Sequence, residues 1–210
     1  MLVVTLVGPS GAGKTTLANS LGADYRIYSR SYKELDHHDL DSRLTISKWL
    51  FVASWFDTML AMESENVPVV IADRSPICAA AYVNVAQDQM LTVCQQSMKE
   101  FIGRGHSVRS ILLTAPVAIL LDRAARKLIS EPDRRKYREH EEPHSRRVWS
   151  FYETHLDLWD IRLNTEKESA DTVAASARKL VSGWIEDSLL LRSCGNLQRF
   201  EPIATNLSQV

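Results

Sequence analysis

Residues 8–15 read GPSGAGKT and fit the pattern G-x-x-x-x-G-K-[ST] in full. This pattern is typical of a loop that binds the phosphates of a nucleoside triphosphate. Glycines let backbone N–H groups converge on a phosphate without a Cβ in the way, and a helix that starts there adds its positive end. We expect Lys14 to reach the β- and γ-phosphates and the Thr15 hydroxyl to ligate Mg²⁺. The candidate ATP-binding residues are Gly8, Pro9, Ser10, Gly11, Ala12, Gly13, Lys14, Thr15 and Thr16.

The sequence on either side of this loop meets the structural requirement of the motif. Residues 2–7, LVVTLV, form an apolar β-branched run that indicates a buried strand, and residues 14–21 indicate the helix that follows. The alternative is a glycine-rich strand-to-helix turn that binds nothing. The complete motif in this context favours nucleotide binding.

A second pair of chemistry-bearing residues, Asp73 and Arg74, follows the apolar run of residues 68–72, PVVIA. Ligands of open α/β sheets bind at the carboxyl ends of the strands, where Asp73 would lie. Its carboxylate could belong to the Mg²⁺ shell or accept the proton of an attacking hydroxyl, and Arg74 could bind a phosphate through two parallel hydrogen bonds. The alternative is an Asp that caps the turn before the next helix, with a solvated arginine beside it.

Residues 122–147 carry nine Lys or Arg among six acids. Within them, residues 130–143 contain two prolines and almost no apolar side chains, so we expect a mobile, exposed loop. Such a loop over a triphosphate could act as a lid that excludes water and neutralises charge in the transition state. The alternatives are a solvated charged face and a nucleic-acid contact. The candidate lid cations are Arg123, Arg126, Arg134, Arg135 and Arg138.

The elements that must position these residues alternate between strand and helix. We predict strands at residues 2–7, 26–28, 68–72, 108–113 and 161–163, and helices at 14–21, about 46–65, 79–101, 117–129, 143–159 and 170–190. In the second helix, apolar residues recur at helical spacing at Ile46, Trp49, Leu50, Ala53, Phe56 and Leu60. The alternation predicts an α/β domain with a parallel sheet and helices on both faces.

Length and composition are those of one globular domain. The chain has 210 residues, 24% charged, with a formal net charge of −1, which argues mildly against a protein that coats nucleic acid. Its three cysteines have no metal-ligand spacing, and no apolar run approaches the length of a membrane span. We therefore expect a cytoplasmic protein with a domain at residues 1–190. Residues 191–210 form a C-terminal tail, to which we assign no function.

Together these segments resemble the thymidylate kinase and deoxynucleoside kinase superfamily of P-loop kinases, over about residues 1–185. The resemblance rests on GPSGAGKTT at the start, LFVASWFDTML in the second predicted helix and VVIADRSPICAAAY at the second acid. It continues through ILLTAPVAILLDRAARK and PDRRKYREHEEPHSRRVWSFYE in the basic segment. The sequence DRSP is similar to the DRHP of herpesviral thymidine kinases.

The resemblance implies a P-loop NTPase three-layer sandwich, with a five-stranded parallel sheet of order 2-3-1-4-5 and an arginine-rich lid at about residues 122–147. It also implies ATP with Mg²⁺ as the phosphoryl donor and an acceptor pocket between the second and third helices. In the family, Thr15 and Asp73 correspond to the metal shell, Lys14 and the lid arginines to the transferred phosphoryl group, and Arg74 to the acceptor. The implied catalytic residues are Lys14, Asp73, Arg123 and Arg126.

The acceptor side departs from the family pattern. The family arginine that reads the edge of thymine falls near Trp55 here. In place of a family segment after the second strand stands YSRSY, in which Arg30 could bind an acceptor phosphate or be an exposed arginine without a role. Trp55 and Tyr82 could stack on a base, and core packing is the alternative for both. The candidate substrate-binding residues are Arg30, Trp55, Arg74 and Tyr82.

The leading hypothesis is a kinase that transfers the γ-phosphoryl group of ATP to a nucleoside, a nucleoside monophosphate or a related small metabolite. One alternative is a P-loop kinase that phosphorylates a modified, hydroxymethylated nucleotide within DNA, with the basic lid along the phosphate backbone. The other is an ATPase switch whose output is a conformational change. The expected partners are ATP and a small nucleoside-like acceptor, with nucleic acid as the alternative acceptor and no membrane. A homodimer is one option for the assembly.

Overall fold

The structure is a computed structural model, and it describes residues 1–29, 45–83 and 85–193, with side chains to residue 190. Five parallel strands form one sheet of order β2-β3-β1-β4-β5. This confirms the order that the family resemblance implies. The strands are β1 (Leu2–Val7), β2 (Arg26–Tyr28), β3 (Val69–Asp73), β4 (Ser107–Thr114) and β5 (Ile161–Asn164).

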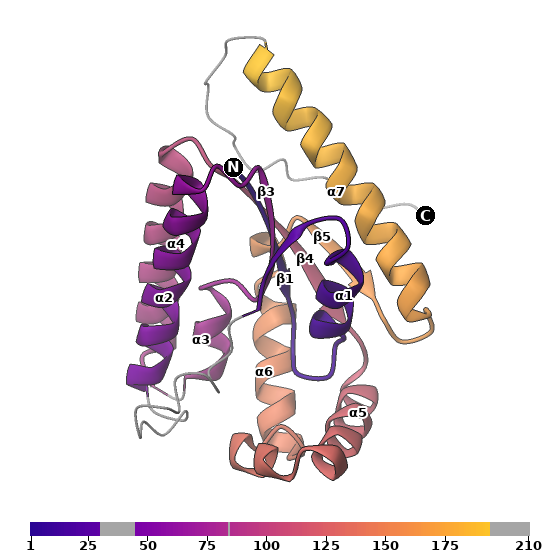
Figure 1. Cartoon of the computed structure of the whole chain (residues 1–210). Coiled ribbons are helices and arrows are strands. Elements are labelled where there is room, and N and C mark those ends of the chain that lie inside the picture. The colour runs from indigo at the N-terminus through magenta and orange to yellow at the C-terminus, as the bar shows by residue number, and fades with distance from the viewer. Residues whose placement is uncertain (30–44, 84, 194–210) are drawn as a thin grey trace.

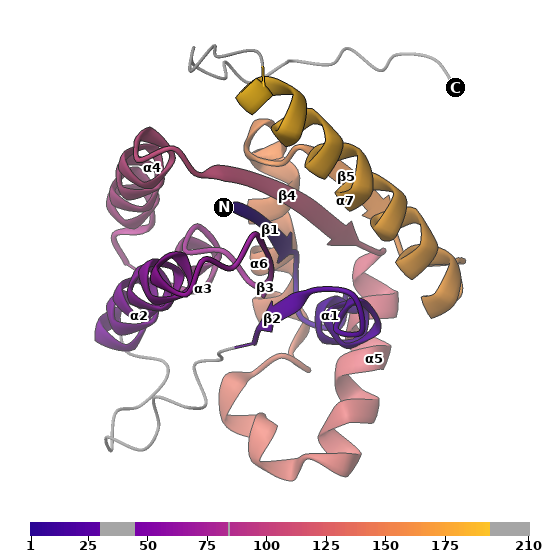
Figure 2. The same cartoon turned by 45° about the horizontal axis from the view of Figure 1, so that its top comes forward.

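Helices cover both faces of the sheet, as Figures 1 and 2 show. One face carries α1 (Lys14–Leu21) and α7 (Ala170–Ser193), and the other carries α2 (Thr45–Ser64), α3 (Cys78–Tyr82), α4 (Gln87–Gly103) and α6 (Glu142–Thr154). At the carboxyl end of the strands lie α5 (Val117–Ser130) and a 3₁₀ helix, η2 (Pro132–Tyr137). A shorter 3₁₀ helix, η3 (Leu156–Leu158), leads into β5.

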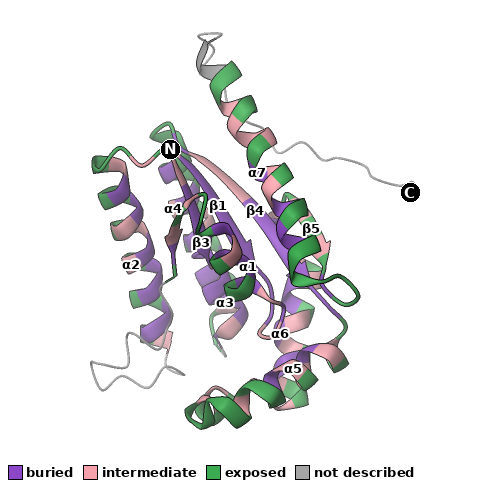
Figure 3. Ribbon diagram, turned by 45° about the vertical axis from the view of Figure 1, so that its right-hand side comes forward, coloured by how far each residue is buried: buried purple, intermediate pink, exposed green. Residues whose placement is uncertain are grey.

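The sheet separates two hydrophobic cores. Val3 and Val7 of β1 pack with α2, α3, α4 and α6, whereas Val4 and Leu6 pack with α1 and α7. Because successive strand residues point to opposite faces, a strand buried on both sides must be apolar throughout, and every residue of β1 is buried. Figure 3 shows this strand in the colour of buried residues between helices whose outer sides are exposed.

The helix predicted over residues 79–101 is wrong as a single element. The chain forms α3 and α4 instead, with Val83 extended and Ala86 in the left-handed region at φ 59°. Three side-chain hydrogen bonds satisfy carbonyl oxygens at the end of α3. Gln87 Nε2 donates to Ala80 at 2.9 Å, and Arg147 Nη1 donates to Ala81 at 3.2 Å and to Val83 at 3.1 Å. Residue 83 can therefore leave the helix although no glycine or proline stands at the break.

Two further helices differ in extent or orientation. The helix predicted at residues 143–159 is shorter in the structure: α6 ends at Thr154. The residues that follow form η3 and an extended turn. In α2 the apolar residues singled out by spacing include the exposed Ile46, Leu50 and Leu60. A neighbouring stripe is buried instead: Ser47, Lys48, Phe51, Val52, Trp55, Met59 and Met62. A helix that is apolar on more than one side gives no unique inner face from spacing alone.

The segment expected to be a mobile, exposed loop, residues 130–143, takes a regular conformation. Its residues Pro132–Tyr137 form η2, which has no buried residue, and ion pairs join the arginines of the segment to neighbouring acids. None of the described helices is both long and apolar enough to cross a membrane. The loop after β1 and this basic segment lie at the same end of the sheet, which places the predicted site between them (Figure 1).

Candidate active site

The loop of residues 8–13 depends on glycine for packing as well as for conformation. Gly8 and Gly11 have φ values of 135° and 82°, a backbone conformation that residues other than glycine rarely adopt. A Cβ on Gly8 would lie 2.1 Å from the Leu113 carbonyl oxygen, and one on Gly11 would lie 2.9 Å from that of Leu120. The start of the loop therefore fits closely against β4 and α5, and its backbone leads directly into α1.

Lys14 is buried, and its ammonium group is turned back onto the loop. Nζ donates to the carbonyl oxygens of Gly8 and Pro9, both at 2.8 Å. Burial, with a further contribution from the Arg74 cation, lowers the pKa of Lys14 to about 8. The side chain is therefore mostly protonated at neutral pH, and it is a strong hydrogen-bond donor held by neutral acceptors. A phosphate is a better acceptor for such a donor than a carbonyl oxygen is.

The Thr15 hydroxyl donates to Oδ2 of Asp73 at 2.7 Å, which joins the first turn of α1 to the end of β3. Asp73 is buried, and its Oδ1 has no hydrogen-bond partner among the described residues. An unpartnered buried carboxylate oxygen is costly unless a ligand completes it. Because oxygen ligands suit Mg²⁺ and this oxygen lies next to a phosphate loop, the two residues fit a metal shell. The same oxygen also fits the role of a proton acceptor.

The acceptor side contains Arg74, whose backbone is strained. Its φ is 120°, in a region that favours glycine, and its N–H donates to the Ala72 carbonyl at 2.9 Å. Its guanidinium lies over the Tyr82 ring, 5.9 Å from the ring centre. Burial raises the pKa of Tyr82 to about 12, so the phenol stays neutral. Arg74 and Tyr82 thus form one polar unit beside Asp73.

Trp55 lies in the core and not on a binding surface. It has no exposed surface, and its ring contacts Phe56 and Phe101 edge-on at centre distances of 5.1 and 5.8 Å. Its Nε1 donates to the carbonyl oxygen of Arg74 at 3.1 Å. Trp55 is fully buried, and among the described residues its hydrogen bond joins it to the backbone of Arg74. The other predicted acceptor contact, Arg30, lies outside the described residues.

The two arginines of α5 have different surroundings. Arg123 donates to the carbonyl oxygen of Gly11 at 3.3 Å, and to the hydroxyl and the carbonyl oxygen of Thr165 at 3.0 and 2.6 Å. It therefore holds the phosphate loop against the chain that follows β5. Arg126 forms a surface ion pair with Asp122 at 2.8 Å, and its side chain is 76% exposed. A catalytic role for either stays a prediction.

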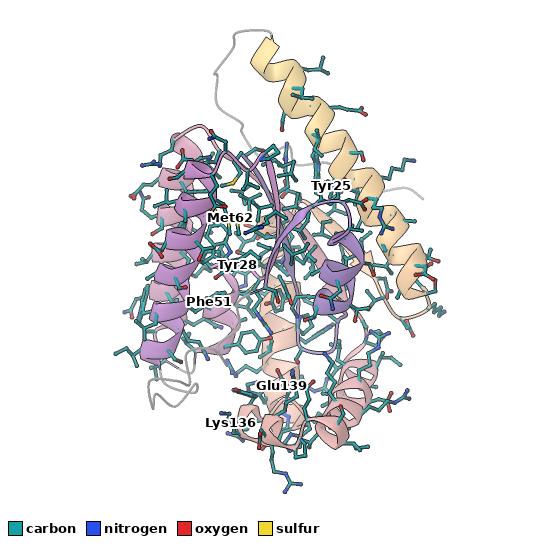
Figure 4. The ribbon with its side chains drawn as sticks, viewed as in Figure 1. Tyr25, Tyr28, Phe51, Met62, Lys136 and Glu139 are labelled. Carbon is teal, nitrogen blue, oxygen red and sulfur yellow. The ribbon has the colours of Figure 1, made fainter. Side chains whose placement is uncertain are left out.

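The lid arginines also differ from one another. Arg134 is largely buried and binds Glu139, whereas Arg138 forms an exposed pair with Glu141 at 2.6 Å. Arg135 is exposed. Sequence reasoning treated the acids of this segment only as counter-charges and so missed Glu139. Its side chain is 13% exposed, and it lies on the side of the lid that faces the loop, with Lys136 farther out (Figure 4).

Glu139 lines a cavity of only about 10 Å³ between the phosphate loop, α3, α5, the lid and α6. Sequence reasoning also missed His144, one of its lining residues. Burial and the neighbouring Arg147 lower the pKa of His144, so its ring is neutral at pH 7. A single histidine within a charged run carries no signal of such a position. The lining residues are Pro9, Ser10, Tyr82, Leu120, Glu139, His144, Ser145 and Val148.

The parallel sheet order, the phosphate loop between β1 and α1, and the Asp at the end of β3 define a P-loop nucleotide-binding domain. The sequence profile of a family described as an AAA domain matches residues 3–162, and the chain belongs to this family. No curated protein sequence matches the chain significantly.

Solved structures of kinases share the fold. Deoxyadenosine kinase from M. mycoides, with the products dCMP and dCDP, is similar with a TM-score of 0.56 and 14% identity over 86% of this chain and 99% of that chain. Its complex with dATP has a TM-score of 0.53 and 15% identity, again over 86% of this chain and 99% of that chain. The YorR protein from Bacillus subtilis, in complex with phosphorylated GDP, has a TM-score of 0.51 and 16% identity over 86% of this chain and 95% of that chain. The resemblance to P-loop kinases of nucleosides and nucleotides is thereby confirmed for the fold.

Proposed function

We propose that the protein is an ATP-dependent kinase that transfers the γ-phosphoryl group to a nucleoside, a nucleoside monophosphate or a related small metabolite. The observation that carries this proposal is the pair of Thr15 and Asp73, whose unpartnered Oδ1 lies at the end of β3. It joins the phosphate loop on one side to the polar unit of Arg74 and Tyr82 on the other. Donor phosphates and an acceptor bound on the two sides would meet at this carboxylate.

Each part of the site has a task in this reaction. The backbone of residues 8–16 and Lys14 bind the donor phosphates, and Lys14 releases the carbonyls of Gly8 and Pro9 to do so. Thr15 and Asp73 would hold Mg²⁺, which supplies positive charge to the phosphate oxygens. An acceptor oxygen attacks the γ-phosphorus as the bond to the β–γ bridging oxygen breaks, and ADP leaves. If the attacking group of the acceptor is a hydroxyl, Asp73 takes up its proton.

The cations around the site complete the proposal. Arg74 orients the acceptor, and the arginines of α5 and the lid neutralise charge that develops on the transferred group. Tyr82, as a neutral phenol, can donate a hydrogen bond to the acceptor. For a substrate group to enter the cavity beside Glu139 the lid would have to move, because about 10 Å³ holds no more than a water molecule.

A single screen tests the proposal. The full chain is incubated with ATP and Mg²⁺ and with nucleosides, nucleoside monophosphates, other phosphorylatable metabolites and short oligonucleotides in separate reactions, and ADP release is measured. We expect release above the acceptor-free rate for at least one small acceptor, and none from a Lys14→Ala variant. Release only with oligonucleotides would favour the alternative of a kinase acting on DNA. Equal release with and without every acceptor would favour an ATPase and contradict the proposal.

A further inference from the structure

A carboxylate of the lid lies beside the phosphate loop. Both Nε and Nη2 of Arg134 donate to the same oxygen of Glu139, at 3.0 and 2.6 Å. Glu139 lines the same small cavity as Pro9 and Ser10 of the loop. The carboxylate of Glu139 therefore stands between the loop and the cation that the lid carries.

The environment of Glu139 keeps it ionised. Burial alone would raise the pKa of this carboxyl, but the Arg134 cation, the hydrogen bonds and the more distant Arg74 hold it below its ordinary value. The chain around it is fixed as well, since the Ser145 hydroxyl donates to the Glu139 carbonyl oxygen at 2.7 Å. An anion is therefore held between a loop hydroxyl and a lid arginine, at a place where the proposed reaction brings phosphate.

These donors are of the kind that a phosphate uses. A hydroxyl of the loop and a planar guanidinium suit phosphate oxygens as well as they suit a carboxylate. The cavity beside Glu139, about 10 Å³, has no room for a phosphate group while the carboxylate stays where it is. A phosphate bound beside Ser10 and Glu139 would therefore compete for Arg134 and for the same space.

We propose that Glu139 is a positioning residue that stands in for a phosphate in the nucleotide-free protein. This inference rests on the proposed function: ATP binding displaces Glu139 from its place beside Ser10 and transfers Arg134 from the carboxylate to the phosphate chain. Glu139 thus keeps Arg134 at the site before the nucleotide arrives and lowers the apparent affinity for ATP by the cost of its own displacement. Removal of its charge should tighten ATP binding and loosen the empty lid.

The chain offers a matched control. Glu141 lies two residues further along, in an ion pair with Arg138 at 2.6 Å, but that pair is exposed. Glu139→Gln and Glu141→Gln each remove one charge from the same segment and keep its shape. Only the first removes a charge held against the phosphate loop.

The experiment measures ATP-Mg²⁺ binding by calorimetry without an acceptor, and hydrogen exchange of residues 131–141 in the nucleotide-free protein. For Glu139→Gln we expect roughly tenfold tighter binding, the scale of one charge-assisted contact that no longer has to be displaced, and faster exchange. Glu141→Gln should match the wild type within about twofold in both measurements. Weaker or unchanged ATP binding in Glu139→Gln, or equal changes in the two variants, would overturn the proposal.

Ser10→Ala provides a second test if Glu139→Gln does not fold. It removes the loop hydroxyl that lines the cavity with Glu139, from a partly exposed position, and we expect faster exchange of the nucleotide-free lid. Unchanged lid exchange in this variant would contradict the connection between loop and lid. Because neither measurement needs an acceptor or turnover, failure of the ADP-release screen and failure of this inference are separate results.

Discussion

The phosphate loop and the lid face each other at one end of the sheet, and they are stabilised in different ways. In the loop, Lys14 is bound by carbonyls five and six residues earlier in the chain. In the lid, the contact that buries Arg134 is an ion pair with Glu139, which lies beside Ser10 of the loop. The ammonium of the loop is thus held by neighbouring backbone groups, whereas the cation of the lid is held by a carboxylate.

Substitutions in the two regions should therefore act differently. Changes in the loop and at the end of β3 remove groups that the reaction needs in every state, so they should abolish activity without large effects on the lid. Changes in the lid should alter the balance between a nucleotide-free form and a nucleotide-bound form.

Asp73→Asn should reduce turnover by about 10²–10⁴-fold, the range for loss of a positioned base, and loss of a metal ligand would also be severe. The substitution keeps the shape of the side chain and the acceptor of the Thr15 hydrogen bond. Steady-state ADP release with a working acceptor measures the effect, and thermal unfolding serves as the control. A variant that melts at a lower temperature but retains activity would make Asp73 a structural cap.

Lys14→Ala should cost about 3–4 kcal/mol in transition-state stabilisation, comparable to the loss of other electrostatic stabilisers. Within the described part of the chain the ammonium donates to two loop carbonyls and to no other element, so the fold should survive. Circular dichroism checks the fold, and kcat/KM for ATP gives the loss. Retention of more than about a tenth of wild-type turnover would mean that the loop does not bind the transferred phosphate as we infer.

A rise in pH through 8 should weaken ATP binding by the loop and leave the lid unchanged. Because the pKa of Lys14 is lowered to about 8, its cation is lost as pH rises through that value, and ATP affinity should fall by up to tenfold per pH unit above it. Glu139, with its pKa held below the ordinary 4.5, stays ionised throughout this range. Its contribution to stability is present above pH 4.5 and is lost only in more acidic solution.

ATP titrations between pH 6 and 10 check this prediction, with hydrogen exchange of the lid corrected for the intrinsic effect of pH. Affinity that does not change through pH 8, or a lid that loosens there, would remove the distinction between the two regions. Lys14→Arg, whose cation does not titrate in this range, provides the control.

The two arginines of α5 should differ in their effect on stability. Arg123→Ala removes three hydrogen bonds that join the loop to Thr165, and we expect the free energy of unfolding to fall by about 1–3 kcal/mol. Arg126→Ala removes an exposed pair with Asp122, for which about 0.5 kcal/mol or less is expected. Urea denaturation of both variants measures the difference, and equal losses would show that Arg123 does not brace the loop.

Sequence patterns predicted the parts of the molecule that depend on neighbouring residues. The bounds of α1 and β2, Lys14–Leu21 and Arg26–Tyr28, agree with the structure, and so does the strand order that the family resemblance implied. The phosphate loop was accessible to sequence reasoning because its glycines and lysine act within eight residues. The joint assignment of Thr15 and Asp73 to one shell came from the family, and the structure places them in contact.

The remaining features depend on contacts between distant residues. The break between α3 and α4 carries no glycine or proline, and the arginine that caps it, Arg147, lies 66 residues beyond Ala81. Glu139 likewise lines a cavity with Pro9 and Ser10, about 130 residues earlier in the chain. The inner face of α2 was ambiguous because apolar residues occur on several sides, and packing against α3 and α4 selected the stripe that contains Trp55.

The hydrogen bond from Trp55 to the carbonyl of Arg74 has a consequence for attempts to redesign the acceptor. Libraries that aim at a new substrate commonly diversify the position that reads the base in related enzymes, and the resemblance points to the neighbourhood of Trp55. Here that side chain fixes a backbone with a φ of 120° and fills the core between Phe56 and Phe101. Diversity introduced there would mainly yield misfolded clones. Tyr82 and His144, which line the cavity, are better starting positions.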